Sequence, residues 1–384
     1  MKRWIGVLAL SCTLGLAACD DADDHNGALG HAGAGGSGGG GDGGSGGVGG
    51  TGGDEAPGGS GGSGGTGGEG GAEGPVRLLT PRLAGIVDPV AEEAVRAKLA
   101  QEPGSTLEYP LKLFYEVFPD EFDFVFFFAE SDGPVAGVHV PVNRPAIPGT
   151  GIDFPYLSPE IPAKQIRSTI ALQLDTNGPT LHELAHYWAV YLSSDLGFQK
   201  GHWGYAGVHG QLGGFDSGRL ECMAPEGMEP PCQEDPKGGA TYIVDSFGLN
   251  ANGGDSVPYA PLELYLMGLL PADEVPDIFV LVDVLDDQSL PDGRRAIRAA
   301  QIRRVTIEEI IAAHGPRQLA TEDERHFRVA FVLVTGEEPT AEQIAKADGW
   351  VAMFSCEDPE RWVLCFEEAT RGLATVEVTL PDVP

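Results

Sequence analysis

Two histidines and a glutamate in the segment TLHELAHYW, residues 180–188, have the residue types and the spacing of a metal site. An α-helix turns once in 3.6 residues, so His182 and His186 lie one above the other on one helix face. Imidazole nitrogens are common zinc ligands, and a carboxylate beside them serves as general base in metal-assisted hydrolysis. The pattern predicts that His182 and His186 bind Zn²⁺ and that Glu183 is the catalytic base.

The same segment has a purely structural interpretation. Thr180 and Glu183 have the spacing of a helix capping box, in which a glutamate in the first turn accepts a hydrogen bond from the backbone N–H of the cap residue. The two histidines would then be polar residues on a partly buried helix. Since one carboxylate does not easily perform both roles, the function of Glu183 decides between these interpretations.

A catalytic zinc ion needs a third protein ligand and keeps a fourth position for water. The compact arrangement His-Glu-x-x-His-x-x-Gly-x-x-His is absent, because Ala189 and Leu192 occupy the glycine and last histidine positions. The downstream candidates are His202, His209 and Glu263. We favour His202 and keep Glu263 as the alternative; Glu263 is also explained as a first-turn carboxylate attracted by a helix dipole.

Three later segments occur in a suggestive order: GHWG at 201–204, MAP at 223–225 and YAPL at 259–262. Together with the histidine helix, this set resembles the leishmanolysin-like branch of the metzincin clan of zincin metallopeptidases. The resemblance implies that His202 is the third zinc ligand and that Met223 forms the Met-turn beneath the metal. The chain is also similar to uncharacterised exported bacterial lipoproteins that carry the His-Glu-x-x-His motif.

The resemblance implies an α+β fold, a zincin-like two-lobed catalytic domain. A mixed sheet would lie above the active-site helix, and the lower lobe would be mainly helical. Composition favours a buried strand at 121–128 and further strands at 137–142 and 168–174, ahead of the helix that begins at Thr180. By the resemblance, either 137–142 or 168–174 is the edge strand that binds an extended substrate, and the sequence does not choose between them.

Other elements follow from apolar periodicity and helix-start signals. Helices are expected at 90–99 and 109–118, and an apolar helix at 261–270 begins with proline. Segments 280–285, 304–314, 327–334 and 340–354 alternate in strand and helix character, and 374–380 is a last strand candidate. Thr340, with Glu342 close behind it, is a helix-start signal and predicts a helix at 340–354. Residues 271–384 either complete the lower lobe or form a C-terminal subdomain.

The N-terminal part has the organisation of an exported protein. Residues 1–19 have a basic start, a short apolar run and the ending Leu-Ala-Ala-Cys, which predict a lipoprotein signal peptide with lipid attached to Cys19. The alternative is ordinary secretion with cleavage after Ala18. Residues 20–74 are glycine-rich, and we interpret them as a disordered tether. The catalytic domain is expected at 75–384.

The remaining four cysteines and the net charge indicate the compartment and the partners. Local disulfides Cys222–Cys232 and Cys356–Cys365 are the simplest of three possible pairings, and a zinc site made of all four cysteines is a less favoured alternative. The net charge of −33 argues against nucleic acid and anionic membrane surfaces as partners. We expect a monomer at the bacterial cell envelope, on the periplasmic or cell-surface face, that acts on proteins or peptides.

These expectations converge on an exported, membrane-anchored zinc endopeptidase in which Glu183 is the general base. Two other functional classes stay open. One is a surface binding or adhesion lipoprotein in which the zinc helix is structural. The other is a zinc hydrolase of non-peptide amides or esters.

Overall fold

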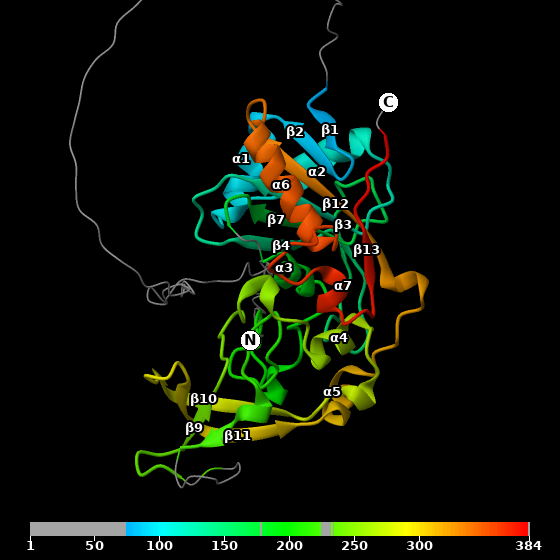
Figure 1. The fold of residues 1–384 in the computed structure, drawn as a ribbon. Coiled ribbons are helices and arrows are strands. Elements are labelled where there is room, and N and C mark those ends of the chain that lie inside the picture. The colour runs from blue at the N-terminus through cyan, green and yellow to red at the C-terminus, as the bar shows by residue number, and fades with distance from the viewer. Residues whose placement is uncertain (1–73, 177–178, 224–231, 233, 383–384) are drawn as a thin grey trace, which may run out of the picture. The chain divides into compact units, whose positions relative to one another are not determined.

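The computed structural model describes residues 74–176, 179–223, 232 and 234–382. These residues belong to one compact unit that begins at residue 73 (Figure 1). The expected signal peptide with Cys19, and the expected tether apart from Gly74, lie outside the described residues.

A mixed seven-stranded sheet forms the larger part of this unit, in the order β1-β2-β12-β3-β7-β4, with β13 paired to β12. Strands β12, β2, β3, β7 and β13 are linked by parallel pairs, whereas β1 and β4 are antiparallel to their neighbours. The strands are β1 (Val76–Thr80), β2 (Leu83–Val87), β3 (Phe124–Ala129), β4 (Gly137–Pro141), β7 (Ser168–Gln173), β12 (His326–Thr335) and β13 (Thr375–Glu377).

Helices cover both faces of this sheet, because the central strands are apolar throughout. Alternate residues of β3 point to opposite faces, so Val125 and Phe127 contact the layer of α1 (Pro89–Leu99) and α2 (Glu108–Val117). Phe124, Phe126 and Phe128 join the other core, with residues of α3 (Thr180–Ala185) and α6 (Ala341–Phe354). The expected helices at 90–99, 109–118 and 340–354 and strand at 121–128 are therefore confirmed, with small shifts in their ends.

The C-terminal part of the chain completes this sheet. Strand β12 lies between β2 and β3, where it pairs in parallel with both. A segment that supplies a central strand shares its core with the N-terminal elements. Residues 271–384 therefore complete the fold and do not form a separate subdomain.

A second, four-stranded antiparallel sheet follows α3 in the chain, with the order β10-β11-β9-β8. Its strands are β8 (Glu221–Cys222), β9 (Ala240–Val244), β10 (Ile278–Ser289) and β11 (Arg295–Val305); Figure 1 shows β9, β10 and β11 at the end of the ribbon away from α1 and α2. The expected mainly helical lower lobe is not confirmed, because a four-stranded sheet forms much of this part of the chain. Besides α6, the described α-helices that follow α3 in the chain are α4 (Pro261–Met267), α5 (Ile307–His314) and α7 (Phe366–Ala369). A two-residue pair, β5 (Asn143–Arg144) with β6 (Tyr156–Leu157), precedes α3.

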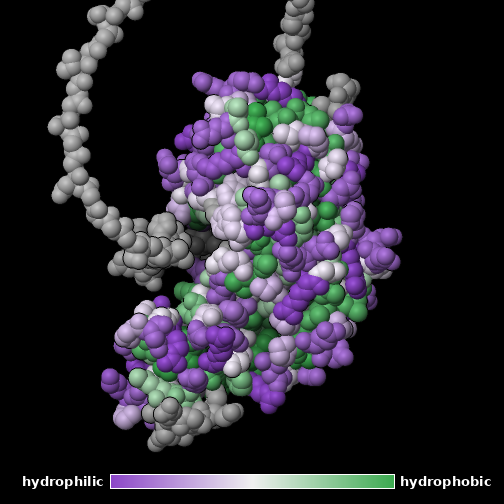
Figure 2. Space-filling view, in the orientation of Figure 1, coloured by the Kyte–Doolittle hydropathy of each residue, from purple (hydrophilic) through white to green (hydrophobic). Residues whose placement is uncertain are grey.

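Both local disulfides, Cys222–Cys232 and Cys356–Cys365, are formed. Disulfides are typical of proteins that fold in an extracellular or periplasmic compartment, and they consume the thiols that a four-cysteine zinc site would need. Within the described part of the chain, no helix has the length and apolar character to cross a membrane. Hydrophilic residues cover most of the face in Figure 2, with smaller hydrophobic areas between them.

Candidate metal centre

The histidine helix α3 is short and is capped by a residue far away in sequence. Asp255 accepts hydrogen bonds from the backbone N–H of Leu181, at 2.9 Å, and from the backbone and side chain of Thr180. The helix begins at Thr180 itself, and its N-cap residue, Pro179, makes no side-chain capping bond. Thr180 is therefore the first residue of the helix and not its cap, so the expected capping box of Thr180 and Glu183 is not formed.

The chain turns sharply after His186, the C-cap of α3. Ala189 stands where the compact zinc motif has glycine, and the next residue, Val190, has a φ of 68°. A left-handed conformation is costly for a β-branched residue, and such strain persists only where the surroundings fix it. Val190 is buried in the core, and the turn leads through the short helix η1 (Ser194–Leu196) towards His202.

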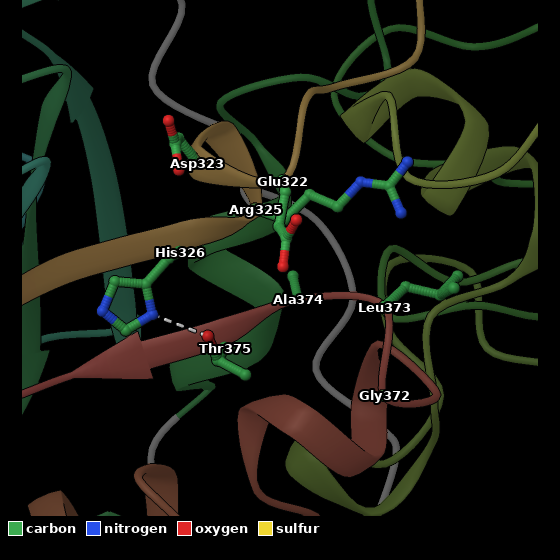
Figure 3. Close-up of a pocket in the computed structure, with 8 residues that line it drawn as sticks. All are labelled: Glu322, Asp323, Arg325, His326, Gly372, Leu373, Ala374 and Thr375. Atoms are coloured by element: carbon green, nitrogen blue, oxygen red, sulfur yellow. Dashed lines mark hydrogen bonds between the residues drawn. The ribbon is translucent and has the colours of Figure 1, made fainter.

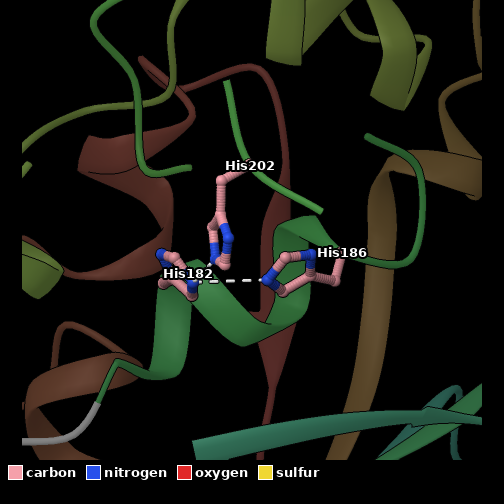
Figure 4. Close-up of side chains that lie close together, drawn as sticks. All are labelled: His182, His186 and His202. Carbon is pink, nitrogen blue, oxygen red and sulfur yellow. Dashed lines mark hydrogen bonds between the residues drawn. The ribbon is translucent and has the colours of Figure 1, made fainter. Parts of the chain in front are cut away.

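The turn brings three histidines together, as Figure 4 shows. The Nε2 atoms of His182 and His186 are 3.3 Å apart, and those of His182 and His202 are also 3.3 Å apart. Two nitrogens bound tetrahedrally to zinc at 2.0–2.1 Å are separated by about 3.3 Å. The three ligand atoms lie within 4.8 Å of one another, so the group has the geometry to hold one metal ion.

Contacts around the cluster keep its imidazoles in the form that binds metal. The Nδ1 atom of His182 donates to the carbonyl of Gln211 at 2.8 Å, which leaves the Nε2 lone pair directed at the cluster. Burial lowers the pKa of His202 to about 4. Burial, followed by the neighbouring histidines, holds the pKa of His186 well below its usual value. Neutral imidazole is the metal ligand, so protons compete weakly for this site.

Glu263, the alternative third ligand, lies near the cluster but makes hydrogen bonds to the chain itself. Its carboxylate accepts four N–H groups: Trp203 Nε1, Gln211 N and Leu212 N, and Ala260 N at the start of α4, all at 2.9–3.0 Å. Both oxygens are engaged, and the carboxylate is not among the candidate metal ligands. Glu263 fixes the segment that carries His202 and the carbonyl that orients His182. Sequence reasoning missed this role, although a glutamate in the first turn of an apolar helix was the available signal.

Glu183 follows the candidate ligand His182 in the helix, and only 7% of its surface is exposed. Its side chain packs against Gly137 of β4. A Cβ atom at position 137 would lie 2.7 Å from Glu183 Cγ and 3.0 Å from Oε1. Gly137 therefore provides the space in which the glutamate lies. The carboxylate is held between the histidine helix and strand β4.

Strand β4 is an edge strand. It pairs with β7 alone among the described strands, whereas β7 lies between β3 and β4. Of the two candidates from the sequence, 137–142 and 168–174, only the former therefore lies at the edge of the described sheet. His139 of β4 has its ring centroid 6.4 Å from that of His186, and burial lowers its pKa to about 3.

Two other residues considered from the sequence lie outside the cluster. Met223 follows β8 and is 58% exposed, which does not support a Met-turn buried beneath a metal; the Ala-Pro that follows it lies outside the described residues. His209 is partly buried, has a φ of 51° and is not among the candidate ligands.

An open groove of about 890 Å³ lies elsewhere, between 322–326 and 372–375 (Figure 3). His326 Nδ1 and Thr375 Oγ1 meet there at 2.7 Å. None of the three clustered histidines lines this groove, so it is separate from the candidate metal centre.

The candidate centre thus combines three convergent imidazoles, a buried carboxylate and an open strand edge. Comparison of the chain with protein-family models, curated proteins and solved structures gives no match.

Proposed function

We propose that the chain is a zinc-dependent endopeptidase whose ligands are His182, His186 and His202 and whose general base is Glu183. The observation that carries the proposal is the 3.3 Å spacing of the Nε2 atoms beside the buried carboxylate of Glu183. Three nitrogen ligands with a nearby glutamate are typical of catalytic zinc, which keeps one coordination position for the reaction. The resemblance to leishmanolysin-like metzincins supports the same assignment.

A zinc ion in this site would act as a Lewis acid that polarises a substrate carbonyl and makes a water molecule a better nucleophile. Glu183 would take a proton from that water and deliver it to the amine that leaves. Edge strand β4 would bind the peptide by adding it as a further strand, because its free backbone groups lie beside Glu183 and His186. We further propose that the two sheets belong to the two lobes of a zincin-like domain, with the cleft at the histidine helix.

The test combines zinc content with peptide cleavage, measured on the chain from residue 75. Glu183→Gln should keep one equivalent of zinc and lose at least about 100-fold in kcat, the usual scale for loss of a general base. His202→Asn should lose zinc. His209→Asn is the matched control, because asparagine tolerates the left-handed backbone at 209 and this histidine lies outside the cluster.

Three results would separate the alternatives. Cleavage by Glu183→Gln at the parent rate would contradict the role of the glutamate. Zinc binding without hydrolysis of any peptide, ester or amide in a substrate panel would favour a binding protein with structural zinc. Hydrolysis of esters or non-peptide amides alone would favour the other class of zinc hydrolase.

We also propose that the chain is exported and carries lipid on Cys19. The ending Leu-Ala-Ala-Cys and the two disulfides support this proposal. Labelling of growing cells with a radioactive fatty acid should mark the parent chain and leave Cys19→Ser unmarked. Equal labelling of both would contradict lipid attachment at this residue.

A further inference from the structure

Arg144 of β5 is a buried cation without a carboxylate. Only 8% of its surface is exposed, and among the described residues its one hydrogen-bond partner is the hydroxyl of Tyr191, 2.8 Å from Nη1. The guanidinium also lies over the Tyr191 ring, 4.8 Å from its centroid. Its Nε atom is buried and has no hydrogen-bond partner. The Nε/Nη2 edge of the guanidinium is therefore left without a partner.

This arrangement is unusual in a chain with 57 acidic and 24 basic residues. Arg82 uses the same Nε/Nη2 edge to bind both oxygens of Asp348, at 3.0 and 2.6 Å. Arg298, Arg317 and Arg325, three half-buried arginines without an ion pair, each donate to backbone carbonyls, those of Gly238, Leu266 and Ala320. Burying an unpaired charge is costly, so a retained unpaired edge indicates a ligand from outside the chain.

The position of Arg144 connects it with the candidate metal centre. The Tyr191 hydroxyl that accepts from Arg144 donates in turn to the backbone carbonyl of His186, at 2.9 Å. Along the edge of the sheet, Gly137 lies against Glu183 and His139 lies beside His186, and Arg144 follows a few residues later. A peptide that extends along β4 from the metal would pass close to this guanidinium.

We propose that Arg144 is a specificity-determining residue that binds a carboxylate of the substrate peptide through its Nε/Nη2 edge. The proposal rests on the peptidase function proposed above. A planar guanidinium matches the two oxygens of a carboxylate, and such charge-assisted pairs are stronger than neutral hydrogen bonds. The carboxylate belongs either to an Asp or Glu side chain or to the free C-terminus of the peptide, and the experiment separates these two sources.

The first measurement needs only the parent chain. A peptide library locates a cleaved sequence, and matched peptides then replace its Glu or Asp by Gln or Asn, or its terminal carboxylate by an amide. We expect kcat/KM to fall about 10- to 100-fold for one of these replacements. If acids and amides are cleaved equally in every pair, the inference is overturned while the peptidase proposal stands. If the parent cleaves no peptide, both fail.

The second measurement assigns the discrimination to Arg144. In Arg144→Gln the ratio of kcat/KM for the acid over the amide should collapse to about one, and Arg144→Lys should restore part of it because it keeps the charge. A merely structural role would lower both rates together and leave the ratio unchanged, which would overturn the assignment. Zinc content and thermal unfolding of each variant show whether the fold is retained, and the parent measurement decides the inference if Arg144→Gln does not fold.

Discussion

Glu263 is the residue whose replacement tests the architecture of the metal centre most directly. Each of its carboxylate oxygens accepts two N–H groups: Oε1 binds Trp203 and Leu212, and Oε2 binds Gln211 and Ala260. Glu263→Gln preserves the shape of the side chain but turns one oxygen into an NH₂ group. Whichever way the amide lies, two N–H donors then face another donor.

The magnitude follows from these contacts. Hydrogen bonds to a charged group contribute about 1.5–3 kcal/mol each, so two lost bonds cost about 3–6 kcal/mol. A neutral amide is cheaper to bury than a carboxylate, and burial does raise the pKa of Glu263, so we expect a result near about 3 kcal/mol. For a chain of this size that corresponds to roughly 6 °C in Tm. Because the segment that holds His202 loosens, zinc affinity should fall by about 10- to 100-fold.

Chelator competition gives the zinc Kd, and thermal unfolding with and without zinc gives the stability. Glu309→Gln is the matched control: Glu309 makes the equivalent capping contact with Thr306 N at the start of α5, at 3.0 Å, but on the surface. The control should lower the Tm much less than Glu263→Gln and leave the zinc Kd unchanged.

Two results would refute this reasoning about Glu263. If Glu263→Gln binds zinc with the parent Kd, the carboxylate does not position the ligands. If the variant keeps its Tm but loses zinc completely, as His202→Asn should, Glu263 would itself be a ligand and the geometry of the centre would be wrong.

Three further predictions concern the surroundings of the site. Gly137→Ala should keep zinc but lower kcat by about tenfold or more, because the added methyl displaces Glu183 from its position. An unchanged kcat would contradict the close contact. The metal-free chain should lose stability as pH falls from about 6.5 towards 4, because the folded pKa values of His139 and His202 are about 3 and about 4 and these two side chains take up protons there only in the unfolded chain. The loss from these two histidines outweighs the opposite contribution of the single Asp255 carboxyl, so a flat urea midpoint over this range would contradict the prediction. Burial raises the pKa of Asp255 to about 7, so its contribution to stability is present below about pH 4 and is lost as pH rises through 7. Asp255→Asn should therefore gain stability relative to the parent from pH 4 to 7. A difference in stability between variant and parent that stays constant over this range would contradict the prediction.

Local patterns in the sequence predicted the parts of the fold that depend on nearby residues. The aromatic run became β3, and the Thr340 signal became a capping box at the start of α6. The His182/His186 spacing and the local disulfides belong to the same class, because each relation spans ten residues or fewer. His202 was predicted from a resemblance, and its place in the cluster depends on the left-handed turn at Val190. A left-handed turn is normally predicted at glycine, so the sequence did not indicate one at this valine.

The features of the fold that the sequence did not predict depend on contacts between segments that are far apart in the chain. β12 enters the sheet between β2 and β3 from more than 190 residues away, and no local pattern in 326–335 specifies its neighbours. The cap of α3 comes from Asp255, which is 74 residues beyond the helix residue that it binds. The capping-box interpretation of Glu183 arose because only local partners are visible in a sequence.

The support of the centre by distant residues also explains why a six-residue helix suffices to present two metal ligands. An isolated helix of that length is unstable in water, because nucleation fixes several residues for one hydrogen bond. Here Asp255 accepts from Leu181 N at 2.9 Å, and Tyr259 donates to the Leu181 carbonyl at 2.8 Å, so the residue before His182 is held on both sides. Both supports come from the segment that leads into α4, the helix that carries Glu263. The segment 255–263 therefore orders both candidate ligand His182 and the segment that carries candidate ligand His202. Substitutions in 255–263 should lower metal affinity even though this segment is distant in sequence from both histidines.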